Sequence, residues 1–482
     1  MALLGHRQKY NPVAGDEELD LPRHAPMSFD KTSRDSIDED AARPPRRSSM
    51  VARWFISFAV FSFLFAGLCP STVRSACGTV SQAVQRPART VEEQARRILA
   101  KSPLIDGHVD FPIAVRAMFG NHIYDQKFRD DFEKGNLRGH VDLKRLRDGQ
   151  SGGAFWSVFA PCPENFSDFS DENYAPTVQF TLSQIDLMNR LQDMYPKELS
   201  QHVDSSNAMR AFKQGKLISP LGVEGLHQVG NKVANLRLYR ELGVRYATLT
   251  HNCHNKFADA ALVEEGAKIA EPLWGGVSPL GQKLVHEMNR IGMIVDLAHV
   301  SDDTMRDVLA GKGDWDGSIA PPIYSHSSAY SICPHPRNVK DDILQLVKRR
   351  NSVVMVNIAP QFISCRTSKS DPSGLPEYVP EDATLDQVVK HIMHIGELIG
   401  YAHVGIGTDF DGIEDVPKGL EDVSKYPDLV AALLKKGVSE TDVRGIVGGN
   451  VLRVWKEVDR VAAVMQAALA PIMEDDEPKL FE

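Results

Sequence analysis

The sequence has no excess of positive charge, and it lacks several common catalytic motifs. Its 482 residues carry a net charge of −9 with a pI near 6.0, and no basic domain stands out, which argues against nucleic-acid binding. It contains no HExxH motif, no GxxxxGK[ST] phosphate loop, and no GxGxxG followed by an acidic residue in a βαβ unit. We therefore do not expect the chain to be a zincin protease, a P-loop protein or a Rossmann-type dehydrogenase.

Cysteine is scarce, and the six cysteines form no CxxC pair, so a structural zinc knuckle is not expected. Four of them lie in the globular part of the chain: Cys162, Cys253, Cys333 and Cys365. An even number of cysteines in a domain outside the cytosol suggests two disulfides. Spacing alone does not tell which of the four pair with one another.

Long hydrophobic runs are scarce, and the strongest candidate for crossing a membrane is a short one. The uncharged run over residues 54–69 would extend about 24 Å as a helix, which is short of a hydrocarbon core about 30 Å thick. A buried core helix and a cleaved signal peptide are the alternatives. The run is rich in aromatics, however, and a signal peptide normally has a much shorter leader than the 53 residues found here. We therefore expect an uncleaved transmembrane signal-anchor over residues 54–70.

The charges beside this run predict its orientation. Four arginines lie within the twelve residues before it, whereas Arg74 is the only basic residue in the twelve that follow. The positive-inside bias predicts a single-pass type II membrane protein, with its large domain lumenal or extracellular, in the secretory pathway, the vacuole or at the cell surface. Residues 1–53 would form a disordered cytoplasmic tail and residues 71–91 a linker. Asn165, in the sequon NFS, would be a glycosylation site usable only in that compartment.

The globular part alternates short apolar runs with helical stretches such as 278–292 and 384–400. The predicted strands are 103–111, 153–160, 216–224, 245–251, 292–299, 321–326, 352–359 and 403–409. Eight strands alternating with helices predict an α/β protein with a (β/α)8 TIM-type barrel, and an open doubly wound sheet is the alternative. The barrel domain would span residues 92–460, with a helix end and an acidic tail over 461–482. In such a barrel the active site lies at the carboxyl ends of the strands.

Ionisable residues stand at several of these strand ends. His108 and Asp110 lie two residues apart, so both side chains would leave the first strand on the same face. Glu224 ends the third strand between two glycines, and it is either a turn residue or a carboxylate that bridges two cations. His299 and His326 end consecutive strands. Imidazoles and carboxylates together are the usual ligand set for zinc.

Three further residues could act on a substrate. Asp409 ends the eighth strand and is either a turn cap or a general acid/base beside a metal centre. His251 ends the fourth strand. Arg337 follows the sixth strand, and it is either a solvated charge or a group that holds a carboxylate through two parallel hydrogen bonds.

Taken in order, these segments resemble the membrane (renal-type) dipeptidases, a zinc metallopeptidase family of the amidohydrolase-like barrel superfamily. The resemblance runs from about residue 92 to 460. It rests on the segments IDGHVDFP, GVEGLH, RYATLTHNCHNKFADA, IVDLAHVS, YSHSSAY, RNVKDD and GTDFDG. It implies that one zinc ion is held by His108 and Asp110 and a second by His299 and His326, with Glu224 bridging the two.

The same resemblance implies roles for the remaining residues. His251 would contact the tetrahedral intermediate, Arg337 the carboxylate of the substrate, and Asp409 would be the acid/base. It also implies two disulfides, one that joins Cys162 to Cys253 and one that joins Cys333 to Cys365. The C-terminus lacks the apolar tail of a GPI signal, so the N-terminal segment would replace that anchor, and a non-covalent homodimer is expected.

These observations predict a binuclear zinc dipeptidase with two zinc ions per chain. One alternative is a related metal-dependent amidohydrolase that acts on N-acyl amino acids or on the Cys-Gly bond of glutathione adducts. A second alternative is a membrane-anchored receptor that has lost catalysis. Such a receptor would be expected to lack a ligand, and none is missing here.

Overall fold

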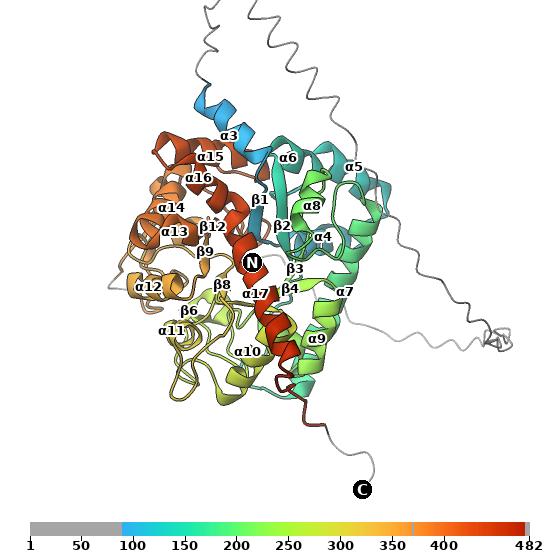
Figure 1. Cartoon of the computed structure of the whole chain (residues 1–482), viewed down its shortest axis with the longest axis vertical. Coiled ribbons are helices and arrows are strands. Elements are labelled where there is room, and N and C mark those ends of the chain that lie inside the picture. The colour runs from blue at the N-terminus through green and yellow to red at the C-terminus, as the bar shows by residue number, and fades with distance from the viewer. Residues whose placement is uncertain (1–88, 369–370, 478–482) are drawn as a thin grey trace, which may run out of the picture. The chain divides into compact units, whose positions relative to one another are not determined.

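Eight parallel strands form one continuous sheet in the computed structural model, in the order β1-β2-β3-β4-β7-β8-β9-β12 (Figure 1). The eight are β1 (Leu104–Val109), β2 (Ser151–Ser157), β3 (Leu221–Glu224), β4 (Val244–Thr248), β7 (Ile294–Asp296), β8 (Ile323–Tyr324), β9 (Val353–Val356) and β12 (Val404–Ile406). All neighbours pair in parallel. Each strand lies at a position that the sequence predicts.

The first and last strands meet at their carboxyl ends, so the sheet is a nearly closed barrel. Asp110 donates its backbone N–H to Phe410 O at 2.9 Å, and Asp409 donates its own to His108 O at 3.1 Å. An isolated parallel bridge joins Val109 to Phe410. The (β/α)8 prediction is therefore confirmed, and the alternative of an open doubly wound sheet is wrong.

The structure describes residues 89–368 and 371–477. The predicted tail over 1–53, the predicted anchor over 54–70 and most of the linker over 71–91 lie outside these residues. Within the described part, none of the helices has the length and apolar character needed to cross a membrane. Contacts divide the chain after Arg86, and the barrel belongs to the unit that begins at Pro87.

Helices surround the barrel (Figure 1). They are α3 (Val91–Leu99), α4 (Phe111–Phe119), α5 (Gln126–Lys134), α6 (Leu143–Asp148), α7 (Asp171–Met194), α8 (Ala208–Lys213), α9 (Val233–Glu241), α10 (Pro279–Ile291), α11 (Asp302–Ala310), α12 (Asp341–Arg349), α13 (Pro360–Ile363), α14 (Leu385–Ile399), α15 (Tyr426–Lys435), α16 (Glu440–Arg444) and α17 (Asn450–Ala467). The last helix ends within the predicted C-terminal segment.

The ends of α10 show why the sequence sets these limits well. Ser278 is the N-cap, and its hydroxyl accepts a hydrogen bond from Gly281 N–H at 3.0 Å. Pro279 occupies the first helical position, where its missing N–H costs nothing. Gly292 ends the helix with φ of 72°, a left-handed conformation that favours glycine. The predicted range of 278–292 differs from α10 only by these two caps.

Two hairpins were not predicted. One consists of β5 (Leu262–Val263) and β6 (Lys268–Ile269), and the other of β10 (Cys365–Arg366) and β11 (Glu377–Tyr378). Each strand has two residues, which is too short for an alternating pattern to be read. The hairpins follow β4 and β9, and both contribute to a cavity at the mouth of the barrel, described below.

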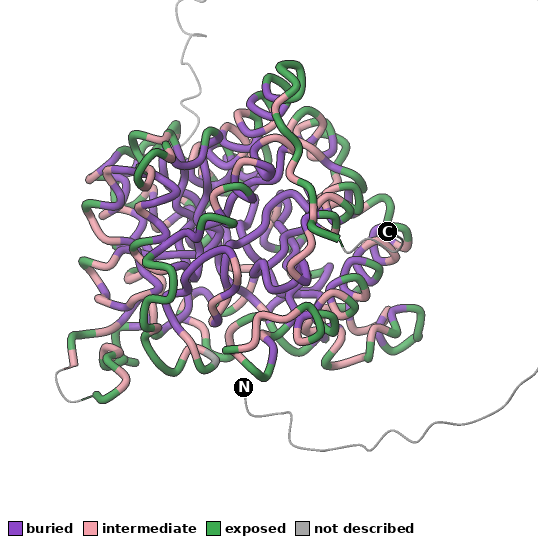
Figure 2. Tube along the Cα trace, turned by 90° about the horizontal axis from the view of Figure 1, so that it is seen from below, coloured by how far each residue is buried: buried purple, intermediate pink, exposed green. Residues whose placement is uncertain are grey.

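The floor of the barrel is apolar and is closed by α17. Trp455 of this helix is buried against Phe155 of β2, with ring centroids 5.5 Å apart. Arg453 donates hydrogen bonds to Asn351 O and Ala402 O, which directly precede β9 and β12. Figure 2, turned by 90° from the view of Figure 1, shows buried residues through the interior and exposed residues mainly at the periphery. The opposite end of the barrel is left open for polar side chains.

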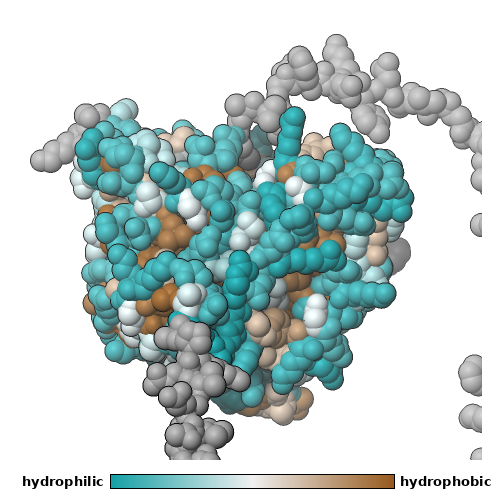
Figure 3. Space-filling view, turned by 90° about the horizontal axis from the view of Figure 1, so that it is seen from above, coloured by the Kyte–Doolittle hydropathy of each residue, from teal (hydrophilic) through white to brown (hydrophobic). Residues whose placement is uncertain are grey.

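On the face seen from above, hydrophobic residues form separate patches between hydrophilic ones (Figure 3). The folding energy therefore comes mainly from the interior, where most of the large apolar side chains are buried.

Replacing Trp455 with alanine should lower the free energy of unfolding by about 3–5 kcal/mol, because the cavity left at the floor of the barrel cannot be refilled. Chemical denaturation of the purified protein measures the change. Val464→Ala on the exposed side of the same helix is the control, and it should alter stability by less than about 0.5 kcal/mol. Equal effects of the two variants would contradict the packing described here.

Candidate metal centre and active site

The carboxyl ends of the barrel strands bring the predicted ligands together. His108 lies near the end of β1 and Asp110 just after it, Glu224 is the last residue of β3, and His299 and His326 follow β7 and β8. All five are buried. Their ligand atoms belong to overlapping groups of three that could each hold an ion, namely His108–Glu224–His326, Glu224–His251–His299 and His108–Asp110–Asp409.

Glu224 lies at the centre of this cluster. Its Oε1 atom is 3.0 Å from His299 Nε2, 3.4 Å from His326 Nε2 and 3.4 Å from His108 Nε2. Its backbone N–H donates to Gln228 Oε1 at 3.1 Å, which ties the end of β3 to the following turn. One carboxylate thus faces both predicted pairs of ligands, as a bridging residue must.

Hydrogen bonds at the far side of two histidine rings determine their tautomers. Ser325 Oγ donates its only proton to Asp296 Oδ2 at 2.6 Å, so it must accept the bond from His326 Nδ1 at 2.8 Å. Asn252 Oδ1 accepts from His299 Nδ1 at 2.9 Å. Both Nε2 atoms are therefore without a proton, and burial holds the pKa of each ring well below its usual value. Neutral imidazoles with free Nε2 lone pairs are ready metal ligands.

The two free nitrogens face each other. His299 Nε2 lies 3.0 Å from His326 Nε2, which is a repulsive contact between lone pairs unless a cation is shared. Zinc bonded tetrahedrally to two imidazoles holds their nitrogens roughly 3.3 Å apart. The donor set and its spacing therefore fit a zinc ion.

The other side of the cluster is rich in carboxylates. Asp110 Oδ2 lies 3.0 Å from His108 Nε2, and Asp110 Oδ1 is buried without a hydrogen-bond partner among the described residues. Burial raises the pKa of Asp409 to about 8, and the negative charges of Asp110 and Glu224 act in the same direction. A cation here would satisfy the unpartnered oxygen and offset the crowding of negative charge.

Arg337 is a buried cation that lies over the Phe362 ring, with its carbon Cζ 5.3 Å from the ring centroid. It is only 2% exposed, and all three of its side-chain nitrogens lack a hydrogen-bond partner among the described residues. Burial lowers its pKa to about 10, so it stays charged at neutral pH. With His299 and Phe362 it lines a cavity of about 260 Å³. A guanidinium left unpaired in this way is suited to an anion that enters the cavity.

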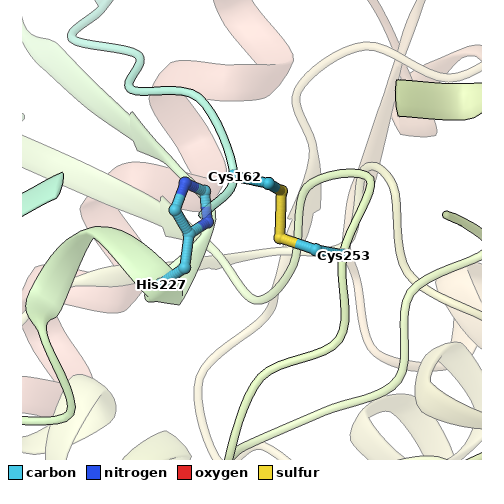
Figure 4. A group of neighbouring side chains, drawn as sticks. All are labelled: Cys162, His227 and Cys253. Carbon is cyan, nitrogen blue, oxygen red and sulfur yellow. A yellow bond between two sulfur atoms is a disulfide. The ribbon is translucent and has the colours of Figure 1, made fainter. Parts of the chain in front are cut away.

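His251 stands beside a disulfide. Its Nε2 lies 4.0 Å from Glu224 Oε1, and its Nδ1 lies 3.9 Å from Cys162 Sγ. Cys162 is bonded to Cys253, two residues after His251. Figure 4 shows the ring of His227 next to Cys162 of this disulfide. Cys162, His227 and Cys253 lie close enough to hold an ion, but the two sulfurs are joined in a disulfide, so these three residues are not a metal site. The Nε2–H of His227 donates a hydrogen bond to Ala160 O at 2.8 Å.

A second disulfide joins Cys333 to Cys365 and so ties the loop that carries Arg337 to strand β10. Both pairings are those that the resemblance implies. Asn165 is exposed, and its Oδ1 accepts a hydrogen bond from Ser167 Oγ at 3.0 Å. Its glycosylation stays a prediction.

Three residues at the site have a left-handed backbone conformation. His299, Asp409 and Asp411 have φ values of 66°, 67° and 66°. Residues with side chains rarely adopt this left-handed conformation, and it persists where surrounding contacts impose it, often at functional sites. At His299 and Asp409 the turn takes the residue out of the strand and directs the side chain toward the cluster.

The sequence did not reveal the residues that orient the site. Tyr246 lies with its hydroxyl 2.7 Å from His108 Nδ1, and Asn357 donates to Asp409 Oδ2 at 3.1 Å. Asn252 and Ser325 hold the other two rings. Asn252 and Ser325 are chain neighbours of predicted site residues, which is the only signal that could have pointed to them. Tyr246 lies in the segment RYATLTHNCHNKFADA, but nothing there assigned it a role, and nothing in the sequence marks Asn357.

A (β/α)8 barrel with buried histidines and carboxylates gathered at its carboxyl end is an arrangement typical of metal-dependent hydrolases. The profile of the family "Membrane dipeptidase (Peptidase family M19)" matches residues 92–469. A protein called dipeptidase aclJ, from Aspergillus oryzae (strain ATCC 42149 / RIB 40), is 44% identical over 393 residues, which cover 80% of this chain and 85% of that one. The chain belongs to the membrane dipeptidase family and is a hydrolase of the metallo-dipeptidase class.

Other relatives agree. An uncharacterized dipeptidase of Schizosaccharomyces pombe (strain 972 / ATCC 24843), C3A11.10c, is 45% identical over 376 residues, or 77% of this chain and 84% of that one. Among solved structures, the probable dipeptidase PvdM from Pseudomonas aeruginosa is 22% identical, with a TM-score of 0.65 over 77% of this chain and 99% of that one. A metallo peptidase from Rhodobacter sphaeroides is also 22% identical, with a TM-score of 0.62 over 74% and 99%. The two structures share the fold of this chain.

Replacing Glu224 with glutamine should weaken metal binding at the cluster, because it removes the negative charge that faces His108, His299 and His326. We expect activity to fall by more than about 100-fold, the upper range for residues that only support ligands. Metal content and thermal stability of the purified variant measure the effect. Glu287→Gln, at a buried carboxylate paired with Arg237 and Arg290, is the control and should keep its metal. Normal metal content in Glu224→Gln would show that Glu224 is not needed to hold the metal.

Proposed function

We propose that the chain is a binuclear zinc dipeptidase that cleaves dipeptides with a free C-terminal carboxylate. The observation that carries this proposal is a five-residue ligand cluster beside an unpartnered buried arginine. The cluster would hold one ion through His108 and Asp110 and the other through His299 and His326, with Glu224 between them. When bound, such ions lower the pKa of water to roughly 7 and polarise a carbonyl group.

Arg337 would select the substrate. Its unpaired nitrogens can hold a carboxylate through two parallel hydrogen bonds, and the small cavity limits how far this carboxylate lies from the cluster. A substrate held in this way has one residue between its carboxylate and the scissile bond. The Rhodobacter sphaeroides metallo peptidase, which has the same fold, was solved with a phosphinate mimic of the dipeptide L-Ala-D-Ala, in support of a dipeptide substrate.

Asp409 and His251 would carry out the remaining steps. Asn357 holds one oxygen of Asp409, so the other is free to take a proton from the attacking water and to deliver it to the leaving amine. His251 presents Nε2 toward the cluster and would donate a hydrogen bond to the developing oxyanion, a contribution of roughly 3–4 kcal/mol.

The same cluster could serve the two related amide substrates named above, and substrate tests separate them. An N-acetylated dipeptide lacks the free amine, so a dipeptidase should reject it and an N-acyl amino acid hydrolase should accept it. Turnover of a cysteinyl-glycine adduct but not of Gly-Gly would favour the adduct as the substrate.

Removing the ions with a chelator should abolish activity, because the proposed reaction needs the ions to activate water and to polarise the carbonyl group. The purified full-length chain should contain about two zinc ions, lose turnover of a glycine dipeptide when they are removed, and regain it when zinc is restored. Mass spectrometry of the metal content together with the peptide assay measures this. Two ions without dipeptide turnover would shift the substrate to another amide. A folded chain that binds no metal would overturn the proposal.

Replacing Arg337 with alanine should raise KM for dipeptides by about 10–100-fold, because charge-assisted hydrogen bonds to the carboxylate are lost. The variant should also stop distinguishing a dipeptide from its C-terminal amide. Arg366→Ala, at an exposed arginine paired with Glu377, is the matched control and should leave KM unchanged. An unaltered KM in Arg337→Ala would show that Arg337 does not bind the substrate carboxylate.

We propose in addition that residues 54–70 anchor the protein as a type II membrane protein, with the barrel in the lumen or outside the cell and Asn165 glycosylated. Two disulfides support an oxidising compartment. The barrel would form a non-covalent homodimer. Protease protection, glycosidase digestion and the mass in solution are the corresponding measurements.

A further inference from the structure

Asp296 is a fully buried carboxylate at the end of β7, three residues before His299. Its Oδ2 accepts hydrogen bonds from Thr248 Oγ1 and Ser325 Oγ, both at 2.6 Å. Its Oδ1 accepts from Ser325 N–H at 2.7 Å and from Ala298 N–H at 3.2 Å. One side chain at the end of β7 thus holds the ends of β4 and β8 and the turn that leads to His299.

Asp106 of β1 makes the same four kinds of bond on the opposite side of the barrel. Its Oδ1 accepts from His108 N–H at 3.1 Å and from Thr408 N–H at 2.9 Å. Its Oδ2 accepts from Thr408 Oγ1 at 2.5 Å and from the Tyr426 hydroxyl at 2.6 Å. Asp106 therefore holds the end of β1 against the segment that leads from β12 to Asp409.

The two carboxylates share a pattern that packing alone does not require. In each, Oδ1 accepts the N–H of the residue two positions later and a backbone N–H from a neighbouring strand end. In each, Oδ2 accepts two hydroxyl protons. Both are fully buried, so each depends on these four donors to offset the loss of water.

We propose that Asp106 and Asp296 are positioning residues, each of which sets one half of the metal centre. Asp296 sets the half formed by His299 and His326, and Asp106 sets the half formed by His108 and Asp110. The inference rests on the proposed function, because it presupposes that this cluster binds two ions.

Asp296 acts on its half through a chain of defined protons. Because it accepts the Ser325 hydroxyl proton, Ser325 Oγ is left to accept the proton of His326 Nδ1, and Nε2 keeps its lone pair toward the cluster. An asparagine at position 296 has only one acceptor oxygen and presents an N–H₂ group to donors. Ser325 would then turn its proton toward His326, and the ring would carry its own proton on Nε2, where a metal cannot bind.

Asp106 acts through the backbone instead. It fixes the N–H of His108 and the turn before Asp409, so its loss should let the first strand end shift away from the last. Within residues 89–368 and 371–477, the backbone joins the carboxyl ends of β1 and β12 through an isolated bridge and two hydrogen bonds, and Asp106 adds two hydrogen bonds from Thr408 to this side of the barrel. Metal ligands need their geometry held closely, and outer-shell changes cost roughly 10–100-fold in affinity.

The test is a zinc titration of the full-length chain against a competing chelator, with Asp296→Asn, Asp106→Asn and Glu287→Gln compared with the wild type. Each aspartate variant should keep one ion at wild-type affinity and bind the other about 10–100-fold more weakly. Glu287→Gln changes an equally buried carboxylate away from the cluster, and it should bind both ions normally even if it melts at a lower temperature.

Double variants identify which ion each residue controls. Asp296→Asn should have no further effect on affinity in a His326→Ala background, and its full effect in an Asp110→Ala background. Asp106→Asn should show the reverse. Normal binding of both ions by Asp296→Asn and Asp106→Asn would overturn the inference while leaving the metal centre intact. A wild-type chain that binds no zinc would overturn both.

Single hydroxyl changes keep the inference testable if an aspartate variant does not fold. Thr248→Val removes one donor to Asp296, and Thr408→Val removes one donor to Asp106. Each should weaken one ion, whereas Thr248→Ser and Thr408→Ser retain the hydroxyl and should restore it. Equal affinities in the valine and serine variants would contradict the positioning role.

Discussion

The site depends on one crowded contact, in which a single carboxylate oxygen of Glu224 lies 3.0–3.4 Å from the Nε2 atoms of three histidine rings. The hydrogen bonds of two of these rings leave their Nε2 atoms without protons. Buried lone pairs and carboxylates this close repel one another in a medium of low dielectric constant. Cations bound between these atoms would remove that repulsion.

The barrel provides this arrangement because parallel strands end on the same side. Strands β1, β3, β7 and β8 each deliver one part of the ligand set, and Asp106 and Asp296 hold neighbouring ends together beneath it. Apolar packing at the floor, where Trp455 contacts Phe155, contributes free energy of folding that offsets the cost of burying polar groups at the mouth of the barrel. The disulfides hold two mouth loops, those that carry His251 and Arg337.

Much of the fold and of the candidate site could be predicted from the sequence, because the signals lie in short stretches of the chain. The eight apolar runs and the caps of α10 follow from composition and spacing, and a histidine such as His326 at a strand end is visible without a structure. The two short hairpins, the left-handed turn at His299 and two hydrogen-bond partners could not be predicted. These partners are Tyr246, which bonds the ring of His108, and Asn357, which bonds the carboxylate of Asp409. The strands of the hairpins are too short for a local pattern, and the two hydrogen-bond partners depend on contacts between segments far apart in the chain.

The most direct test of the account is an anomalous diffraction map of the crystallised protein, recorded at the zinc absorption edge. The account predicts two peaks about 3.5–4 Å apart. Glu224 should lie between them, with His108 and Asp110 at one and His299 and His326 at the other. One peak, or none in a crystal grown with zinc, would contradict the two-ion centre.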